Sequence, residues 1–116
     1  MDGCTTIAAG NINADIAQDL ACNPNEQVDT LLATPGVRIE RIVSMGHTSP
    51  DGFWYDQEED EFVLLVSGHA RLTIEHQAER LLTAGDWVHI KAHVRHRVKW
   101  TDPSCPAVWL AVFVRT

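Results

Sequence analysis

Hydrophobic and polar residues alternate along residues 94–100 more regularly than elsewhere in this chain. One parity carries only basic side chains, and the other is apolar except for a single histidine, His96. Because successive side chains of a strand point to opposite faces, this pattern predicts a strand with a charged outer face and a buried inner face. The inner face would comprise Val94, His96, Val98 and Trp100. A buried imidazole needs a polar partner, and another segment has to supply it.

Similar short blocks, separated by turn-forming residues, fill the chain from residue 37 onward. We predict strands at 37–45, 53–57, 62–66, 70–75, 79–82, 87–90, 94–100 and 107–114. The block 70–75 alternates regularly, whereas 62–66 is continuously apolar, as expected of a strand buried on both faces. Many short strands with frequent turns indicate an all-β sandwich or barrel rather than a parallel sheet.

The first part of the chain differs in character, because residues 1–36 are polar and rich in small side chains. A helical turn is expected within 14–22, before an Asn-Pro-Asn break. The segment 26–33 suits either an edge strand or a helix over the barrel end. We therefore expect an N-terminal extension, 1–36, that packs on a barrel domain, 37–116.

Acidic residues gather just before the apolar run at 62–66. Most of them suit a solvated loop. Counting back by twos from the predicted strand places four side chains on one side, namely Tyr55, Gln57, Glu59 and Glu61. Glu61 directly precedes the buried strand, so its carboxylate can face the imidazole of His96. A carboxylate opposite a buried imidazole is a common way to hold a divalent cation.

These segments resemble the two motifs of the cupin superfamily of small β-barrels. The first motif runs Gly, five residues, His-x-His, three or four residues, Glu, six residues, Gly. Glu61, followed after six residues by Gly68, matches its end, but the two histidines fall on Tyr55 and Gln57. The first motif is therefore degenerate, and among its usual metal ligands only Glu61 is kept.

The second cupin motif runs Gly, five residues, Pro-x-Gly, two residues, His, three residues, Asn. Gly85 and His96 match it. The other positions depart from it and are Lys91 for proline, His93 for glycine and Trp100 for asparagine. The resemblance covers residues 37–114. It implies a small single-domain cupin, which is a double-stranded β-helix or jelly-roll barrel, here with a short N-terminal helical or irregular segment.

The candidate metal site combines Gln57, Glu61, His93 and His96. Together they offer an amide oxygen, a carboxylate and two imidazoles, a set that suits Mn²⁺, Fe²⁺, Ni²⁺ or Zn²⁺ without choosing among them. His93 stands at the entrance of a predicted strand, where it either turns inward or stays at the surface. His96 also has a structural alternative, as a core histidine hydrogen-bonded to Tyr55 or to a backbone carbonyl.

Two functions fit such a site. In the first, the chain is an enzyme whose metal ion acts on a small molecule, with Tyr55 or His93 as acid or base. In the second, the barrel binds or senses a small molecule without metal or turnover. The resemblance does not choose, since cupins include isomerases, dioxygenases, decarboxylases, sensors and storage proteins. A homodimer is expected in either case, because cupins commonly pair through exposed strands, and the apolar run 107–114 would serve.

Two other residues have an expected inward parity. Trp100 shares the parity of His96 and is expected to form a wall of the pocket. Arg41 shares the parity of Val37, Ile39 and Val43. It therefore either points into the barrel, toward an anionic ligand or Glu61, or snorkels out to solvent at the strand end.

Composition and charge exclude several classes of protein. The chain has 116 residues, of which 45% are hydrophobic, enough for one domain with a real core. A net charge of −7 disfavours nucleic acid and anionic membranes as partners. No apolar stretch approaches the roughly 18 residues of a membrane span, and the N-terminus lacks a signal-peptide pattern, so we expect a cytoplasmic protein. Three widely spaced cysteines indicate neither a disulfide framework nor a thiolate zinc site.

Overall fold

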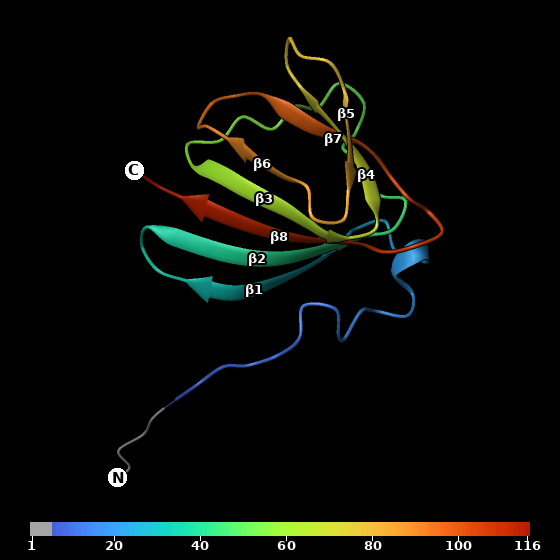
Figure 1. Ribbon diagram of the computed structural model, residues 1–116, viewed down its shortest axis with the longest axis vertical. Coiled ribbons are helices and arrows are strands. Elements are labelled where there is room, and N and C mark those ends of the chain that lie inside the picture. The colour runs from blue at the N-terminus through green and yellow to red at the C-terminus, as the bar shows by residue number, and fades with distance from the viewer. Residues whose placement is uncertain (1–5) are drawn as a thin grey trace.

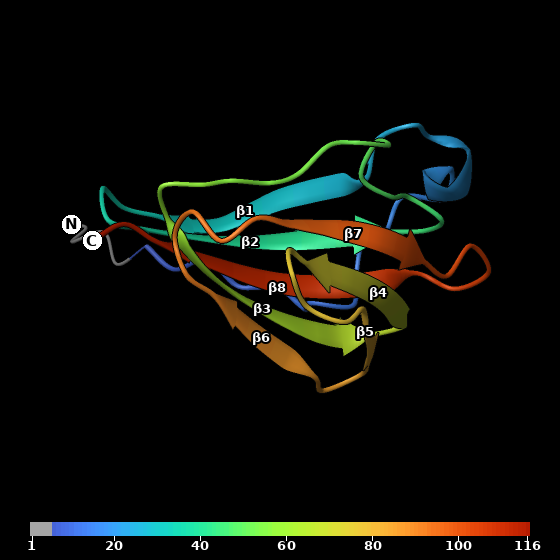
Figure 2. The same cartoon turned by 90° about the horizontal axis from the view of Figure 1, so that it is seen from above.

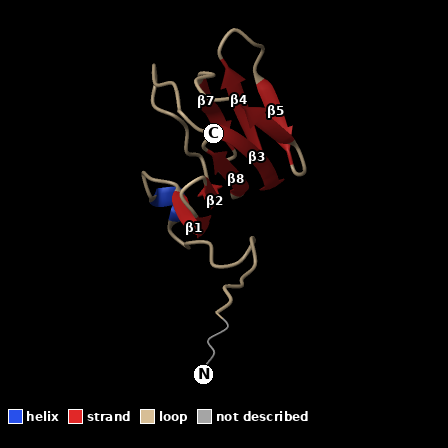
Figure 3. Ribbon diagram, turned by 90° about the vertical axis from the view of Figure 1, so that its left-hand side faces the viewer, coloured by secondary structure: helices blue, strands red, loops and turns tan. Residues whose placement is uncertain are grey.

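Two antiparallel sheets face one another in the computed structural model, which describes residues 6–116 (Figures 1 and 2). The larger sheet has the order β1 (Gln27–Ala33), β2 (Val37–Ser44), β8 (Ala107–Val114), β3 (Asp60–Ser67) and β6 (Trp87–Ile90). The smaller sheet has the order β5 (Arg80–Thr83), β4 (His69–Ile74) and β7 (His96–Thr101). A short 3₁₀ helix, η1 (Leu20–Cys22), precedes β1 (Figure 3). No helix within residues 6–116 is long and apolar enough to cross a membrane.

The core between the sheets follows from the alternation seen in the sequence. On β4 the inward residues Ala70, Leu72 and Ile74 are all buried, as predicted, and they pack with Val63 and Leu65 of β3. Each fully buried Val, Leu or Ile side chain contributes roughly 1.5–3 kcal/mol through removal of apolar surface from water. The predicted all-β jelly-roll architecture is therefore confirmed.

A bulge in β7 changes the side on which one predicted wall residue lies. Arg71 of β4 pairs with Trp100, but the next residue, Leu72, pairs with Val98, so Lys99 is an extra residue. Beyond the bulge the parity reverses, and Thr101 is buried while Trp100 turns outward. The guanidinium of Arg71 lies 5.9 Å from the centre of the Trp100 ring. Trp100 is therefore not among the residues that line the cavity described below.

The segment before residue 37 contributes to the larger sheet. Strand β1 pairs along β2, so the segment 26–33 is an edge strand and not a helix over the barrel end. The boundary drawn at residue 36 thus lies in the turn between two paired strands. Further upstream, Leu20 packs with Val43 and Val108 in a second, smaller core on the outer face of the same sheet.

Arg41 follows neither expectation drawn from the sequence. It is 5% exposed, so it does not snorkel out, and it faces the N-terminal segment rather than the barrel interior. Its guanidinium lies 2.6 Å from the carboxylate of Asp29 and also donates to backbone carbonyls of Ile12, Ala14 and Asp15. The N-terminal segment covers the outer face of β2, and this cover buries Arg41 and Val43.

The last strand lies in the middle of the larger sheet. Strand β8 pairs with β2 on one side and with β3 on the other, so both of its hydrogen-bonding edges are occupied. Residues 107–114 therefore cannot add to a strand of a second chain, because no backbone groups are free on either edge. Strands β1 and β6 form the two ends of this sheet.

The predicted strand 53–57 is reduced to a single bridge. Tyr55 and His96 exchange two backbone hydrogen bonds, of 2.7 and 3.1 Å, while the residues around Tyr55 follow an irregular path. This bridge fixes the loop before β3 against the start of β7. It brings Tyr55 next to the histidine that the sequence placed inside the barrel.

Candidate functional site

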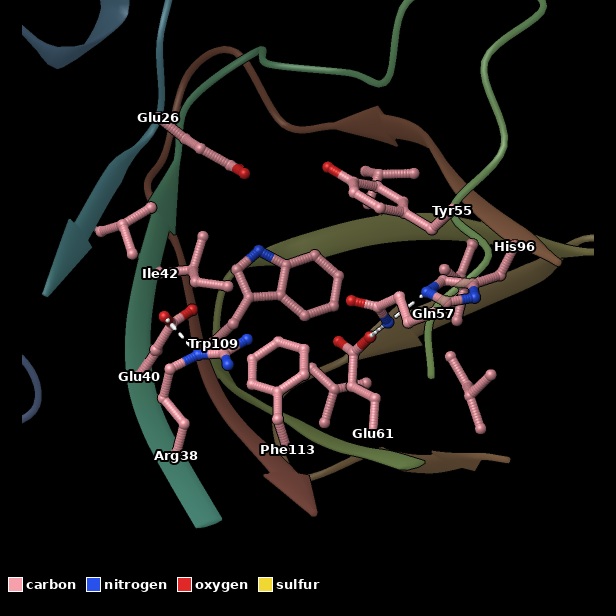
Figure 4. Close-up of a pocket in the computed structure, with 15 residues that line it drawn as sticks. Glu26, Arg38, Glu40, Ile42, Tyr55, Gln57, Glu61, His96, Trp109 and Phe113 are labelled. Atoms are coloured by element: carbon pink, nitrogen blue, oxygen red, sulfur yellow. Dashed lines mark hydrogen bonds and ion pairs between the residues drawn. The ribbon is translucent and has the colours of Figure 1, made fainter. Parts of the chain in front are cut away.

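A cavity of about 260 Å³ lies between the two sheets (Figure 4). Its apolar part includes Trp109, Phe113 and aliphatic side chains from both sheets. Its polar residues are Glu26, Arg38, Glu40, Tyr55, Gln57, Glu61 and His96. A mostly apolar cavity with a few convergent polar groups is typical of a small-molecule site, and this one is near the small end of the usual range.

Glu61 and His96 meet inside this cavity. Glu61 begins β3 and His96 begins β7, so the two sheets each supply one residue. Nε2 of His96 lies 3.2 Å from Oε1 of Glu61, and the side chains are 5% and 13% exposed. Nδ1 of His96 lies 2.9 Å from the carbonyl oxygen of Val94. Because a carbonyl only accepts, Nδ1 carries a proton, and the contact with Glu61 requires a second proton between the two groups.

The environment favours the charged form of His96. Burial disfavours the imidazolium, but the hydrogen bonds to Glu61 and to the Val94 carbonyl, together with the charge of Glu61, outweigh it. The pKa of His96 is therefore raised above its ordinary value of 6.5. His96 therefore stays protonated to a higher pH than an isolated histidine would.

Gln57 completes a short polar chain. Its amide nitrogen donates to Oε1 of Glu61 at 2.9 Å, so this oxygen is shared with His96. The amide oxygen of Gln57 points into the cavity (Figure 4). Gln57 thus stands beside Glu61 and His96, whereas Glu59, which the alternation placed on the same side, is paired with Arg38 and does not line the cavity.

Tyr55 forms a wall next to this pair. Its ring stacks on His96, with ring centres 5.4 Å apart and planes inclined by 24°. Burial, and then the nearby charges of Glu26 and Glu61, raise the pKa of the Tyr55 phenol. The phenol therefore keeps its proton at neutral pH and can donate a hydrogen bond toward the cavity.

His93 does not join this site. Its ring Nδ1 lies 2.8 Å from a carboxylate oxygen of Asp56, its side chain is 66% exposed, and it does not line the cavity. It occupies the glycine position of the second motif and has a φ of 66°, the left-handed conformation that glycine normally supplies there. The turn directs its side chain to the surface. Neither the metal-ligand role nor the acid–base role suggested by the sequence is compatible with this placement.

The sequence did not single out four residues that line the cavity: Glu26, Arg38, Glu40 and Trp109. Both faces of β2 are covered, so alternation does not show which face is inward, and it is the even-numbered residues that line the cavity. Arg38 lies 2.9 Å from Glu40 and 3.1 Å from Glu59, and its guanidinium sits 4.2 Å from the centre of the Phe113 ring. The only local signal was this charged pair two residues apart within an apolar strand.

The potential metal donors are few. Within residues 6–116 no group of three or more His, Cys, Asp or Glu side chains is arranged to hold a metal ion. Glu61 and His96 are two strong donors, and the Gln57 amide is a weaker third. Transition-metal sites in proteins usually have at least three strong protein ligands.

Comparisons with known proteins agree with this architecture. The family description "Cupin domain" matches residues 43–113. A candidate mannose-6-phosphate isomerase from Ralstonia eutropha JMP134 is 46% identical, with a TM-score of 0.88 over 95% of this chain and 100% of that one. A Cupin 2 conserved barrel domain protein from Salinispora arenicola CNS-205 is 21% identical, with a TM-score of 0.68 over 97% of this chain and 91% of that one.

A third solved structure supports the fold alone. It is an RmlC-like cupin family protein with a double-stranded β-helix fold from Methanocaldococcus jannaschii. It is 19% identical, and the match covers 87% of each chain with a TM-score of 0.65. No curated protein matches the sequence.

Proposed function

This chain belongs to the cupin family, and from that membership we propose that its barrel cavity binds a small polar molecule at the pair formed by Glu61 and His96. One observation carries the proposal. A buried carboxylate and a buried imidazole, brought together from opposite sheets at 3.2 Å, both border a cavity of about 260 Å³. Burying two ionisable groups costs free energy even when they are paired. Pairs of this kind that border a cavity are therefore found preferentially at functional sites.

The available donors do not fit a tightly held transition metal. Gln57 turns its amide nitrogen toward Glu61, and His93, the fourth expected ligand, is bound to Asp56 at the surface. Two strong ligands leave a divalent ion such as Mn²⁺, Fe²⁺, Ni²⁺ or Zn²⁺ short of protein donors. We therefore propose that binding of the organic ligand relies on Glu61 and His96 themselves.

Weak metal binding is the second candidate function. Donation from Nδ1 of His96 to a backbone carbonyl is the arrangement that orients many ligating histidines, and it leaves Nε2 for a metal when the imidazole is neutral. Gln57, Glu61 and His96 would then hold the ion, which would supply Lewis-acid chemistry. Cupins commonly bind metals, which supports testing this alternative directly.

If the chain is an enzyme, proton transfer is the reaction class that its groups suit. Nε2 of His96 and Oε1 of Glu61 are in contact and both face the cavity, so this pair can take up or release a proton of the substrate, and Tyr55 can donate a hydrogen bond to an oxygen that becomes negative. Among the described residues no serine or cysteine lines the cavity to act as a nucleophile. The similarity to a candidate mannose-6-phosphate isomerase is consistent with this class, since an isomerase moves a proton between two positions of its substrate.

A ligand screen with paired variants tests the proposal. Ligand-observed NMR of the metal-free protein against polar metabolites should give hits that weaken at least about tenfold in Glu61→Gln and His96→Asn. Glu58→Gln and His76→Asn make the same chemical changes at exposed positions and should leave binding unchanged. Hits that are insensitive to both cavity variants would show that the pair is not the binding centre.

Metal titration separates the two candidates. Elemental analysis of the untagged protein, followed by calorimetry with Mn²⁺, Fe²⁺, Ni²⁺ and Zn²⁺, should show less than one ion per chain and weak affinity. One tightly bound ion per chain, lost in both Glu61→Ala and His96→Ala, would instead make the metal site the working function.

A further inference from the structure

We propose that the cavity has a second recognition end, formed by Glu26, Tyr55 and Trp109, which takes a hydroxyl or ammonium group and rejects phosphate. The inference rests on the proposed function, because it assigns the part of the same ligand that lies away from Glu61 and His96. Its three residues come from different segments: the approach to β1, the loop before β3, and β8.

The polar atoms of this end converge on open space. The carboxylate of Glu26 and the hydroxyl of Tyr55 point toward one another across the cavity (Figure 4). Ser44 donates from Oγ to Oε2 of Glu26 at 2.7 Å, which fixes the carboxylate and leaves Oε1 to accept from a ligand. This arrangement is built and held by the protein, which lowers the cost of ordering it on binding.

Trp109 supplies an unused donor at the same place. Its side chain is 5% exposed, and its indole nitrogen is turned toward the space between Glu26 and Tyr55 (Figure 4). Among residues 6–116 no protein atom accepts a hydrogen bond from this nitrogen. This N–H borders the cavity without a protein acceptor, so a ligand oxygen placed there can accept a hydrogen bond from it.

The charges that line the cavity decide the class of ligand. The cavity is lined by the carboxylates of Glu26, Glu40 and Glu61 and by two cations, Arg38 and His96. Both cations are already paired. Arg38 pairs with Glu40 and with Glu59 outside the cavity, and His96 pairs with Glu61. Glu26 is hydrogen-bonded by Ser44, and no cation of the described chain forms an ion pair with it. A phosphate at this end would meet the negative charge of half-buried Glu26, which no cation of the described chain pairs, and this repulsion is unfavourable.

A hydroxyl or ammonium group fits each of these atoms. Either group can donate to Glu26, and a hydroxyl can in addition accept from the Trp109 nitrogen or the Tyr55 phenol. The rings of Trp109 and Phe113 offer an apolar wall to carbon-bound hydrogens of the same ligand. An unphosphorylated polyol, or its amino derivative, matches this alternation of polar atoms and apolar surface.

A matched set of three ligands tests the assignment. Calorimetry would compare mannose, mannosamine and mannose 6-phosphate against the untagged wild-type protein. We expect mannose or mannosamine to bind at least about tenfold more tightly than the phosphate ester. In Glu26→Gln, which keeps the shape and the Ser44 contact, mannosamine should lose about tenfold and the penalty on the phosphate ester should shrink by a similar factor.

The same three sugars serve for the control variants. Glu58→Gln changes the net charge equally at an exposed position and should leave all three affinities unchanged. Tyr55→Phe keeps the ring on His96 and should weaken binding without unfolding the protein. The inference would be overturned if the protein preferred the phosphate ester, or if Glu26→Gln changed none of the three affinities. Either result would leave the proposed function intact.

Two further outcomes separate the inference from the proposed function. If none of the three sugars binds while other polar molecules still bind at Glu61 and His96, this class of ligand is wrong. If no polar molecule binds in either experiment, the proposed function fails and this inference fails with it.

Discussion

Nε2 of His96 lies 3.2 Å from Oε1 of Glu61, although the two residues are 35 positions apart in the sequence and belong to different sheets. The contact joins the sheets at the polar side of an otherwise apolar core. It also means that Glu61 helps to raise the pKa of His96. The behaviour of this pair can therefore be followed by pH as well as by mutation.

We predict that His96 in the metal-free protein titrates at higher pH than a free histidine. Its folded pKa is raised, so its contribution to stability is fully present below the unfolded value of about 6.5 and is lost as pH rises through the folded pKa. NMR titration of the histidine ring protons would measure this. In Glu61→Gln the same resonance should move back toward lower pH. An unchanged titration in that variant would show that Glu61 does not set the protonation of His96.

Gly68 should tolerate no side chain. Its φ is 88°, and a Cβ there would lie 2.5 Å from the Pro106 carbonyl oxygen and 2.7 Å from Cα of Ala107. We predict that Gly68→Ala lowers the free energy of unfolding by about 3 kcal/mol or more, through overpacking and backbone strain. Gly52→Ala is the control, since Gly52 also has a positive φ but no atom within 4 Å, and should cost only about 1 kcal/mol. Urea denaturation would compare the two, and equal losses would refute the close-contact argument.

The two tryptophans should differ in their effect on ligand binding. Trp109 lines the cavity, whereas the bulge in β7 turns Trp100 toward Arg71 on the outside. Trp109→Phe removes the indole donor and should weaken a hit from the screen about tenfold, while Trp100→Phe should leave its affinity unchanged. Calorimetry would measure the ligand affinity of both variants. A larger loss of affinity in Trp100→Phe than in Trp109→Phe would mean that Trp100 forms the wall, as the simple parity suggested.

His93 should be dispensable for binding. Its side chain is exposed and bonded to Asp56, so His93→Ala should leave the affinity for any cavity ligand within about twofold of the wild type. Loss of binding comparable to that of His96→Asn would require His93 to reach the cavity in the bound state. The same calorimetric assay applies.

We also expect a homodimer, but with an interface formed by β1 and not by residues 107–114. Strand β1 lies at the end of the larger sheet and exposes Val28, Leu31 and Leu32, each close to half of its surface. Light scattering should give a mass near twice 12.9 kDa, and Leu32→Glu should shift it to the monomer. Leu81→Glu, on the edge strand β5, is a control of similar exposure and should keep the dimer. A monomeric wild type at micromolar concentration would contradict the expectation.

The sequence by itself determined most of the strands and indicated the central pair. Period-two alternation is a local property of the backbone, so 87–90 and 107–114 were predicted with their observed bounds, and Ala70, Leu72 and Ile74 were assigned inward. Local alternation placed His96 on an inward face, and the resemblance to the two cupin motifs supported its pairing with Glu61.

Only the tertiary structure decided which way several other side chains face. Both faces of β2 are covered, so alternation alone could not show that Arg38 faces the cavity while Arg41 is buried under the N-terminal segment. An unpaired residue at Lys99 reverses the parity beyond it, and nothing local marks that bulge. Strand order likewise depends on contacts between distant segments, and these long-range contacts place β8 in the middle of its sheet and Glu26 opposite Tyr55.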